Sequence, residues 1–476
     1  MTLISQSVAL LKTVLITVTR KTIALLIAFQ SALTKATPRS VSALTANRLF
    51  RTQSELNEKQ VRAVIRADLF FSVEVKMKIA GIICEYNPFH NGHSYQIKRV
   101  RESGATHIVC VMSGNFVQRG ECAFADKWTR AKTAVLGGAD LVVELPTPWA
   151  CSAAENFARG GVSLMKELGI DLLSFGCETE DEVLLKKAAH AVDSPKISKL
   201  VKMKISEGMI YPRALQEAVD EVFGTETSKV LSSPNNILAV EYIRQAEKLG
   251  GTFSFLPIER IGTHHDSLTP QDDAITGALS IRNFERIEDA SQFVSPKTLS
   301  ELLAQKEKGL FPCKVEFADR AVMAVLRAYT PDDFKLFVPD ENGLAERLFS
   351  SSRKAETVSE LTNDVKVKSI TQAAVRRAIM LSFLKIKKDV AQGEIPYVKI
   401  LATNEKGLEI LRKRPGSLPT VVRKKDAENL SERGKEIYRL ECDCTDKFSL
   451  FSNRIAPCSR EMTSQIFVYT EKEPRR

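Results

Sequence analysis

The stretch from Ile79 to Ser103, IAGIICEYNPFHNGHSYQIKRVRES, contains an apolar run, a turn-forming segment and a basic segment in direct succession. The run KIAGIIC, residues 78–84, has the length and composition of a buried β-strand. The segment EYNPFHNG, with its proline, asparagines and glycine, is typical of a turn. Residues 93–103 then place apolar side chains at helical spacing, and Gly104 is positioned to end that helix. The stretch therefore predicts a strand, a turn and a helix.

The alternation of strand-like and helix-like segments continues beyond this stretch. Apolar runs at residues 106–114, 140–146 and 170–176 predict further strands, and helical patterns lie between them at residues 126–138 and 153–168. Strands that alternate with helices favour an α/β fold in which helices cover both faces of a parallel, Rossmann-like sheet. Ligands of such sheets bind at the carboxyl ends of the strands, near the point where the strand order reverses. The turn EYNPFHNGH lies at such an end, directly after the first strand.

Two of the chain's six histidines, His90 and His93, lie in this turn, with Asn91 and Gly92 between them. A helix begins here, so unpaired N–H groups and the positive end of the helix dipole face the same place. Gly92 has no Cβ and lets the backbone approach a ligand. Both imidazoles can then face a phosphate and stabilise the oxygens that gain charge when the bond between the α- and β-phosphates breaks. The alternatives are that the histidines cap the helix or pair with a carboxylate; a zinc site lacks an identifiable third ligand.

The residues around these histidines resemble a known family. H-x-G-H after a first strand is similar to the signature of the nucleotidyltransferase superfamily, which class I aminoacyl-tRNA synthetases share. The longer string GIICEYNPFHNGH resembles the bacterial tRNA(Met) cytidine acetate ligase family more specifically. The resemblance covers residues 77–282 well and the remainder more loosely. Further segments that carry it are MSGNFVQRGE at 112–121, DKWTRA at 126–131, GADLVVELP at 138–146, SFGCE at 174–178, SPNNILAVEYI at 233–243 and IERIG at 258–262.

The resemblance implies an enzyme that uses ATP, with Mg²⁺ on the phosphates, to convert acetate into acetyl-adenylate and pyrophosphate. The acetyl group would then pass to N4 of the wobble cytidine of elongator tRNA(Met). His90 and His93 would be the catalytic residues, and the charge of Arg119 makes it a candidate contact for acetate. The resemblance also implies these ATP-binding residues: Ile83, Cys84, Glu85, Tyr86, Asn87, Pro88, Phe89, His90, Asn91, Gly92, His93, Ser94, Tyr95, Gln96, Gly176, Asn235 and Arg260.

A second nucleotide-binding element of the family, ASATAIR, corresponds here to TGALSIR, residues 276–282. Gly277 and Leu279 replace hydroxyl residues of the family pattern. Ser280 and Arg282 remain as expected phosphate contacts.

A basic run that opens a helix in the family corresponds to KSITQAAVRRAIMLSFL, which begins at Lys368. Ser369 and Ala374 stand where arginines are expected. Lys368, Arg376 and Arg377 remain as candidate contacts to tRNA phosphates. An ordinary solvated helix face explains the same pattern equally well.

The sequence predicts three parts. Residues 1–76 precede the family pattern, residues 77–290 form a nucleotidyltransferase domain for ATP and acetate, and residues 291–476 form a C-terminal tRNA-binding region. This last part has amphipathic helices and then a strand–helix–strand pattern at residues 396–424.

Two other functions fit parts of the pattern. A small-molecule adenylyltransferase would use the same H-x-G-H chemistry, but about 150 residues suffice for one such domain, so the C-terminal part would have no role. An RNA-binding protein whose nucleotide site has decayed would explain Gly277 and Leu279, but it would not explain the intact loop of His90 and His93. Acetate-dependent exchange of pyrophosphate into ATP separates these functions from the ligase.

The net charge of +10 is concentrated near the N-terminus. Residues 1–76 hold 11 of the 68 basic and 4 of the 58 acidic residues, so they carry +7 and the remaining 400 residues carry +3. Net charge alone therefore does not predict a polyanionic partner. Three interpretations of residues 1–76 remain open: the natural chain starts at Met77, the segment is a targeting segment, or it is a membrane anchor. The anchor is disfavoured, because the apolar stretch is divided by Lys12, Arg20 and Lys21 into pieces too short to cross a bilayer.

The nine cysteines include no C-x-x-C pair, which favours free thiols in a reducing compartment over a disulfide framework. The expected location is the cytoplasm, without stable membrane association. The pattern specifies no oligomeric state.

Overall fold

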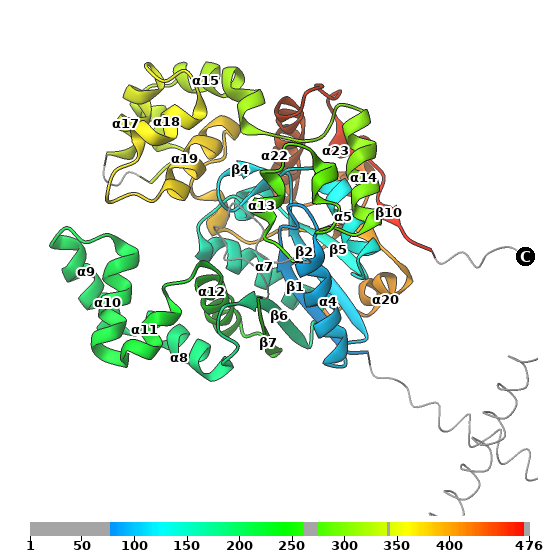
Figure 1. Cartoon of the computed structure of the whole chain (residues 1–476), viewed down its shortest axis with the longest axis horizontal. Coiled ribbons are helices and arrows are strands. Elements are labelled where there is room, and N and C mark those ends of the chain that lie inside the picture. The colour runs from blue at the N-terminus through cyan, green and yellow to red at the C-terminus, as the bar shows by residue number, and fades with distance from the viewer. Residues whose placement is uncertain (1–76, 261–274, 340–342, 471–476) are drawn as a thin grey trace, which may run out of the picture. The chain divides into compact units, whose positions relative to one another are not determined.

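The structure is a computed structural model that describes residues 77–260, 275–339 and 343–470 (Figure 1). Residues from Met77 onward form one compact unit. The three interpretations of residues 1–76 lie outside the described residues. Within the described ranges, no helix has the length and apolar character needed to span a membrane.

A mostly parallel sheet occupies the centre of this unit, as the alternating pattern predicts (Figure 1). Its parallel strands follow the order β5–β2–β1–β6–β7. The runs that form β1, β2 and β5 are almost entirely buried, which explains why polar and apolar residues do not alternate along them. The strands are β1 (Ile79–Cys84), β2 (His107–Ser113), β5 (Leu141–Leu145), β6 (Leu172–Cys177) and β7 (Ser254–Glu259).

Helices cover both faces of the sheet. Ile82 and Cys110 belong to the core on one face, whereas Ile83 and Val111 belong to the core on the other. The first face carries α4 (Asn91–Glu102) and α5 (Lys127–Leu136), and the second carries α7 (Ala154–Leu168), α8 (Glu182–Asp193) and α12 (Pro234–Lys248).

The helices of the first face begin at capping side chains. The carboxylate of Asp126 accepts a hydrogen bond from the backbone N–H of Thr129, over 2.8 Å, and so starts α5 where the sequence predicts. Helix α4 begins at Asn91, two residues earlier than predicted, because the side chain of His90 caps it. It ends before Gly104, whose φ of +90° no ordinary side chain adopts easily.

The strand order reverses next to β1. The chain runs from β1 to β2 and β5 on one side, and later returns to the other side of β1 to form β6 and β7. The carboxyl ends of β1 and β6 therefore flank a topological switch point, the usual ligand position in such sheets.

Strands from the C-terminal part extend the sheet beyond β5. β8 (Val398–Thr403) pairs antiparallel with β5, and both β9 (Thr420–Val421) and β10 (Phe467–Val468) pair with β8. β8, α20 (Glu405–Lys413) and β9 form the predicted strand–helix–strand unit. The domain boundary at residue 290 stays a prediction, and the sheet contains strands from both sides of it.

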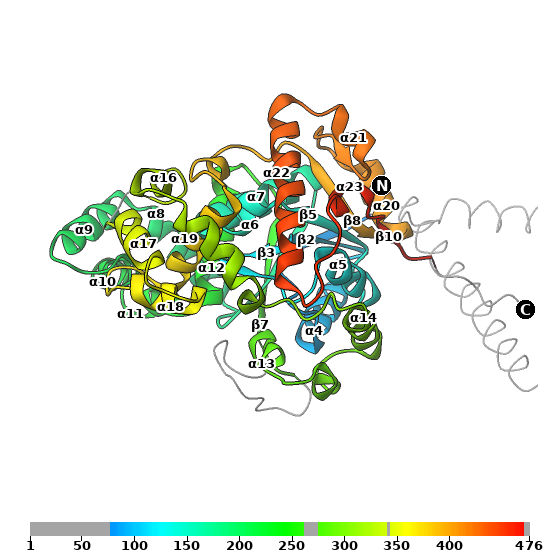
Figure 2. The ribbon, with the colours of Figure 1, turned by 90° about the horizontal axis from the view of Figure 1, so that it is seen from above.

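Two helical regions extend from the sheet (Figure 1). One follows β6, and the other has a separate core that includes Phe334, Leu348 and Phe383. Figure 2 shows α22 (Glu432–Phe448) between this second region and β8. The first region contains α9 (Pro195–Ser206), α10 (Tyr211–Phe223) and α11 (Thr225–Val230); the second contains α15 (Asp319–Arg327), α16 (Pro331–Lys335), α17 (Leu344–Ser352), α18 (Val358–Val365) and α19 (Gln372–Leu384).

The remaining elements connect these parts. They are β3 (Phe116–Val117), β4 (Glu121–Cys122), α6 (Thr147–Ala150), α13 (Ala278–Arg282), η1 (Ile287–Ala290), α14 (Pro296–Glu307), η2 (Val315–Ala318), η3 (Val390–Gln392), α21 (Lys424–Glu428), η4 (Ser449–Phe451) and α23 (Arg460–Thr463).

Buried charges join the last helices to the sheet. The ammonium of Lys127 in α5 lies 2.6 Å from the carboxylate of Glu144 in β5 and 2.7 Å from that of Glu461 in α23. Lys399 of β8 lies 3.1 Å from Glu461, and Glu441 of α22 accepts two hydrogen bonds at the start of α6. The ion pairs fix α23 against β5 and β8, and the hydrogen bonds of Glu441 fix α22 against α6.

Candidate functional site

A cavity of about 210 Å³ lies where the carboxyl ends of β1 and β6 meet the starts of α12 and α13. The turn after β1 forms one side of it, and residues that follow β7 form another. Its described lining residues are Ile83, Cys84, Glu85, Tyr86, Asn87, His90, His93, Gln96, Gln118, Arg119, Phe157, Phe175, Gly176, Asn235, Leu238, Tyr242, Arg260, Gly277, Ala278, Leu279 and Arg282.

The two histidines form a reciprocal cap at the start of α4. Nδ1 of His90 accepts a hydrogen bond from the backbone N–H of Gly92, over 3.1 Å. Nδ1 of His93 accepts one from the backbone N–H of His90, over 3.2 Å. The rings stack with their centroids 3.7 Å apart. Because both Nδ1 atoms accept, each neutral ring carries its proton on Nε2 and keeps that N–H as a donor.

The capping role and the donor role therefore coexist on each ring. A Cβ built on Gly92 would lie 2.9 Å from Cε1 of His90. The glycine of H-N-G-H is needed because the His90 ring folds back over it, which is a different reason from the backbone approach that the sequence suggested.

The histidines are neutral near pH 7. Burial is the main cause that lowers the pKa of His90 from 6.5 to about 3, and the positive charges of Arg260 and Arg282 lower it further. The pKa of His93 is also well below its usual value, first because of burial and then because of His90 and Arg260. Each ring thus donates from Nε2 without carrying a charge of its own.

A buried arginine that the sequence pattern did not single out shapes the turn after β1. Arg130 of α5 donates hydrogen bonds to the backbone carbonyls of Glu85, Ser113 and Ala125. It thereby holds together the ends of β1 and β2. Tyr86 has a φ of +45°, an unusual value for a side chain with a Cβ, and such values concentrate at functional sites.

The loop also contacts the second nucleotide element. The carbonyl of Asn87 accepts a hydrogen bond from Arg282, over 2.9 Å, and the Asn87 side chain accepts one from the backbone N–H of Phe124, over 2.6 Å. Arg282 thus reaches the turn after β1 although TGALSIR departs from the family pattern at Gly277 and Leu279. Both of these residues line the cavity as well.

The cavity has a positive lining. Arg119, Arg260 and Arg282 all line it, against one carboxylate among the described lining residues, Glu85. Burial raises the pKa of Glu85, and the carboxylate accepts a hydrogen bond from the backbone N–H of Gln118, over 3.0 Å. This lining suits an anionic ligand.

Asn235 is held in place by a residue of the SFGCE segment. Its amide donates a hydrogen bond to Glu178, over 2.6 Å, and Glu178 also accepts one from the backbone N–H of Asn236, over 3.1 Å. Gly176, at the end of β6, lines the cavity beside Asn235. The predicted residues Gly176, Asn235 and Arg260 therefore meet the turn after β1 in one cavity.

Some of the predicted nucleotide residues lie elsewhere. Phe89 is buried in the core, and Asn91 donates hydrogen bonds to the carbonyls of Phe293 and Gln292. Gly92 and Tyr95 line an adjoining recess of about 60 Å³. Pro88, Ser94 and Ser280 lie outside the described wall of both spaces, and Ser280 is buried. Their contribution to nucleotide binding stays a prediction.

An apolar part of the wall was missed in the sequence. Phe157, Phe175, Leu238 and Tyr242 line the cavity, but at helical and strand spacing they look like core residues. Three of them, Phe175, Leu238 and Tyr242, fall inside motifs that the family resemblance uses. Their place inside these motifs is the one signal in the sequence that pointed to them.

The candidate tRNA contacts lie in two different environments. Lys368 is exposed. Arg376 forms an ion pair with Glu121, and Arg377 donates a hydrogen bond to the carbonyl of Gln118, over 3.3 Å. The two arginines therefore connect α19 to the hairpin of β3 and β4.

Metal ligands are sparse. The part of the chain that the structure describes has no group of three or more histidine, cysteine or acidic side chains that could hold a metal ion. With Glu85 as the one carboxylate of the described lining, the cavity fits a magnesium ion carried by substrate phosphates better than one held in a protein cage.

Comparison with known proteins gives close matches. Residues 77–463 match the model of a family described as HIGH Nucleotidyl Transferase. A protein of Thermoanaerobacter pseudethanolicus named tRNA(Met) cytidine acetate ligase is 35% identical over 387 residues, which are 79% of this chain and 95% of the relative. A protein of the same name from Clostridium kluyveri is 33% identical over 401 residues, 80% of this chain and 96% of the relative.

Solved structures agree with these relatives. The apo crystal structure of Thermotoga maritima TmcAL matches with a TM-score of 0.78 and 28% identity, over 82% of this chain and 99% of that chain. A second structure of the Thermotoga protein, bound with alpha-thio ATP, matches with a TM-score of 0.76 at the same identity and coverage.

Proposed function

The chain belongs to the HIGH nucleotidyltransferase family and, within it, to the tRNA(Met) cytidine acetate ligases, and we propose that it is an ATP-dependent ligase that acetylates tRNA(Met). In the first step a carboxylate oxygen of acetate attacks the α-phosphate of ATP, and pyrophosphate leaves. In the second step N4 of the wobble cytidine of elongator tRNA(Met) attacks the acetyl carbon, and AMP leaves. One observation carries this proposal: two neutral histidines, each with an Nε2–H donor, line a cavity that also contains three arginines.

The first step needs stabilisation of negative charge and no protein nucleophile. As the bond between the α- and β-phosphates breaks, charge builds up on their oxygens, and fixed N–H donors of His90 and His93 would stabilise it. Arg260 and Arg282 would offset the charge of the triphosphate, and Arg119 would hold acetate. The apolar side chains of the wall offer a surface for the uncharged parts of the substrates. Mg²⁺ would arrive with the triphosphate and shield its charge.

The nucleotide is also supported by similarity. The Thermotoga relative binds alpha-thio ATP, and its structure aligns with most of this chain. The turn from Ile83 to Gln96, with Gly176, Asn235 and Arg260, remains the proposed ATP site.

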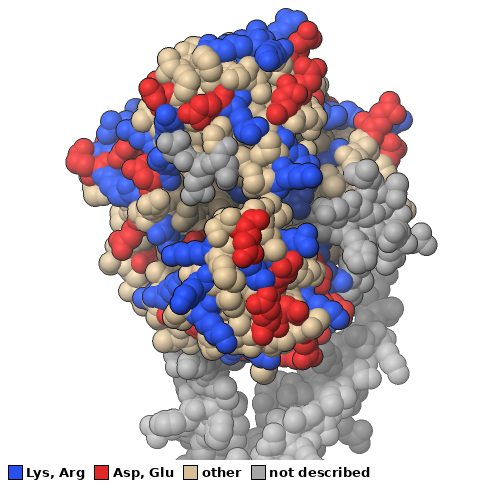
Figure 3. Space-filling view, turned by 90° about the vertical axis from the view of Figure 1, so that its left-hand side faces the viewer, with Lys and Arg blue, Asp and Glu red and all other residues tan. Residues whose placement is uncertain are grey.

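The tRNA would approach over the face in Figure 3, where Lys and Arg side chains gather on both sides of a hollowed centre. Lys196, Lys199 and Lys202 are exposed along α9, and Lys368 is exposed before α19. Such lysines bind phosphates without reading sequence. Lys368, Arg376 and Arg377 stay candidate contacts. The proposed location is the cytoplasm, where ATP and tRNA occur and where the nine free cysteines would stay reduced.

Exchange of labelled pyrophosphate into ATP, measured with the full chain, tests the first step. Acetate-dependent exchange is expected. Exchange that needs a nucleotide precursor and ignores acetate would instead support a small-molecule adenylyltransferase. Absence of exchange, both with and without tRNA(Met), would contradict the proposal. The second step is tested by mass analysis of tRNA(Met) after incubation with ATP and acetate.

A further inference from the structure

A second cavity, of about 410 Å³, adjoins the proposed ATP cavity. Leu279 and Arg282 line both spaces. The segment of residues 118–122 also separates them, because Gln118 and Arg119 line the first cavity whereas Gly120, Glu121 and Cys122 line the second. A ligand in the second cavity would therefore lie next to the reacting groups in the first.

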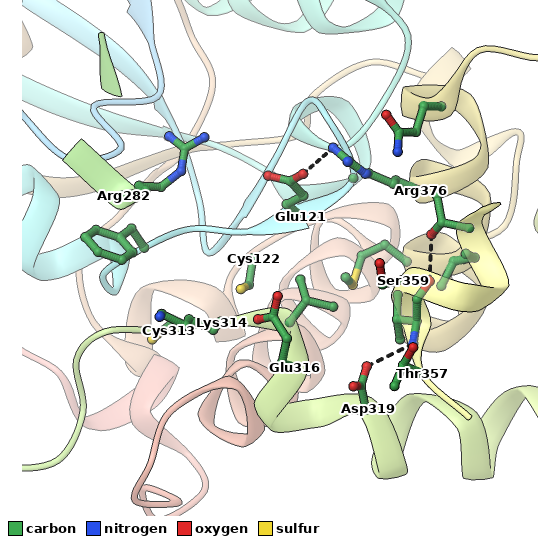
Figure 4. A pocket seen from close by; sticks show the side chains of 18 of the residues that line it. Glu121, Cys122, Arg282, Cys313, Lys314, Glu316, Asp319, Thr357, Ser359 and Arg376 are labelled. Carbon is green, nitrogen blue, oxygen red and sulfur yellow. Dashed lines mark hydrogen bonds and ion pairs between the residues drawn. The ribbon is translucent and has the colours of Figure 1, made fainter. Parts of the chain in front are cut away.

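Charged and hydroxyl side chains surround this second cavity (Figure 4). Glu121, Glu316 and Asp319 contribute carboxylates, and they balance the positive charges of Lys314, Arg282 and Arg376. Thr357 and Ser359 add hydroxyl groups near the start of α18. Because carboxylates and cationic groups are balanced, the wall suits an uncharged ligand that presents both hydrogen-bond donors and acceptors.

Glu121 is held at the side that borders the ATP cavity. Its carboxylate forms an ion pair with Arg376 of α19. Among the charges that act on Arg282, that of Glu121 has the largest effect on the arginine's pKa. In Figure 4, Glu121 and Arg282 lie on one side of the cavity, and Asp319 and Thr357 lie on the other. The ion pair therefore fixes one carboxylate beside the shared wall.

The hairpin that carries Glu121 is itself rigidly packed. Gly120 has a φ of +76°, and a Cβ on it would lie 2.3 Å from the backbone nitrogen of Arg377. Arg377 holds the carbonyl of Gln118 in the same hairpin. The hairpin thus packs directly on α19, and Glu121 has little freedom to move away from the cavity.

The remaining wall is apolar. Phe124, Val358, Ile379 and Met380 are buried and line the cavity, whereas Lys314, Glu316 and Ser359 are exposed at its edge. The volume falls in the range of about 300–1,000 Å³ that is usual for small-molecule ligands. An aromatic ring could enter with its faces against the apolar side chains and its polar edge toward Glu121.

We propose that this cavity receives the acceptor cytosine of the RNA, turned out of its stack, and that the carboxylate of Glu121 accepts a hydrogen bond from the exocyclic N4 amine. The proposal rests on the function proposed above and assigns the acceptor base a site in the same enzyme. Proteins read single-stranded bases by turning them out and contacting their edges, and carboxylates are the usual partners of the cytosine N4 amine.

The position of Glu121 suits the transfer step. N4 attacks the carbonyl carbon of the acetyl-adenylate, and a C–N bond forms. The C–O bond to the phosphate breaks, and AMP leaves with the electron pair. N4 gives one proton to the carboxylate of Glu121. The acetyl group therefore passes at the border of the two cavities, beside Leu279 and Arg282, and no further reactant is needed.

Binding of two tRNA(Met) transcripts, one with cytidine and one with uridine at the acceptor position, tests the site without catalysis. Uridine presents an O4 acceptor to Glu121 where cytidine presents a donor. The wild-type chain, without ATP, is expected to bind the cytidine form about tenfold more tightly. Glu121→Gln is expected to abolish this preference, because the glutamine amide can donate to O4.

Arg376→Gln is the matched control, because it breaks the same ion pair but leaves the carboxylate in the cavity. It is expected to keep the cytidine preference if Glu121 contacts the base, while both RNAs bind more weakly through loss of a positive charge. An equal loss of preference in the two variants would show that Glu121 acts only through the packing of α19, and would overturn the proposal. An unchanged preference in Glu121→Gln would overturn it as well.

Blocking the cavity gives an independent test. Ser359 is exposed at its edge, so Ser359→Trp fills the space with little risk to folding. The ratio of acetyl transfer to pyrophosphate exchange is expected to fall at least about tenfold. An unchanged ratio would contradict the acceptor site while the exchange itself still supported the ligase. Absence of exchange in the wild-type chain would remove the ligase proposal, and the binding preference would still decide whether the cavity reads cytosine.

Discussion

Lys127 and Glu461 form an ion pair of 2.7 Å that is almost completely closed to solvent and joins the start of α5 to α23. Glu144 lies 2.6 Å from the same ammonium. Removing one partner of a buried pair leaves an uncompensated charge, which typically costs about 3–5 kcal/mol. We expect Lys127→Met to lower the free energy of unfolding by this order, measured by urea denaturation followed by circular dichroism.

Lys132→Met is the control for that prediction. Lys132 lies 2.7 Å from Glu301, but the two side chains are 33% and 23% exposed. An ion pair in contact with water contributes less than about 1 kcal/mol. Similar losses in the two variants would contradict the role assigned to burial.

Glu441 belongs to the same buried group and gives a prediction about pH. Burial, and then the charge of Glu144, raises its pKa from 4.5 to about 8. Between these two values the folded chain keeps a proton that the unfolded chain has released, so this carboxyl lowers the stability as the pH rises through that window. Glu441→Gln keeps the shape and can keep both hydrogen bonds to Thr147 without titrating.

Relative to the wild type, Glu441→Gln is therefore expected to gain stability as the pH rises from about 5 to about 8. Urea midpoints at several pH values measure the difference. A difference that stays constant across this range would show that the folded chain does not hold the proton.

The sequence predicted the centre of the fold because local patterns determine it. Buried parallel strands need continuous apolar runs, and the segments between them have helical spacing, so both can be found without knowledge of contacts. The pairing of β8 with β5 could not be predicted in this way. It depends on a contact between distant parts of the chain, and Lys127, Lys399 and Glu461 look like ordinary charged residues until that contact forms.

The site was predictable where its chemistry needs unusual residues. The H-N-G-H spacing gave His90 and His93, but it did not show that one ring nitrogen caps the helix while the other stays a donor. Phe157 and Tyr242 were missed because an apolar side chain that faces a cavity has the same spacing as one that faces the core. Arg376 stays a candidate contact to tRNA phosphates, and its partner Glu121 lies on a hairpin that sequence spacing could not place beside it.

Arg119 and Arg260 line the same cavity and are expected to serve different substrates. If Arg119 holds acetate, then Arg119→Gln removes a charge-assisted hydrogen bond and raises the KM for acetate about tenfold or more, with a smaller effect on the KM for ATP. Arg260→Gln is expected to do the reverse. Pyrophosphate exchange at varied acetate and ATP concentrations measures both constants. Parallel changes in the two constants for Arg119→Gln would contradict the acetate assignment.

The two roles of His90 can be separated by substitution. Asparagine places an oxygen near the position of Nδ1 and is among the best residues for starting a helix, but it has no atom at the position of Nε2. His90→Asn is therefore expected to unfold at a temperature close to that of the wild type, whereas the kcat of exchange falls by about two to three orders of magnitude. Thermal unfolding and pyrophosphate exchange measure the two effects on one preparation.

His90→Gln and His90→Ala complete this test. Glutamine places its amide nitrogen near the position of Nε2, so His90→Gln is expected to retain more exchange activity than His90→Asn while losing part of the cap. His90→Ala loses both groups, and a lost cap typically costs about 1 kcal/mol. If His90→Asn kept full turnover, the ring would serve only to start α4, and the stabilisation of the leaving phosphate would have to come from His93 and the arginines of the cavity.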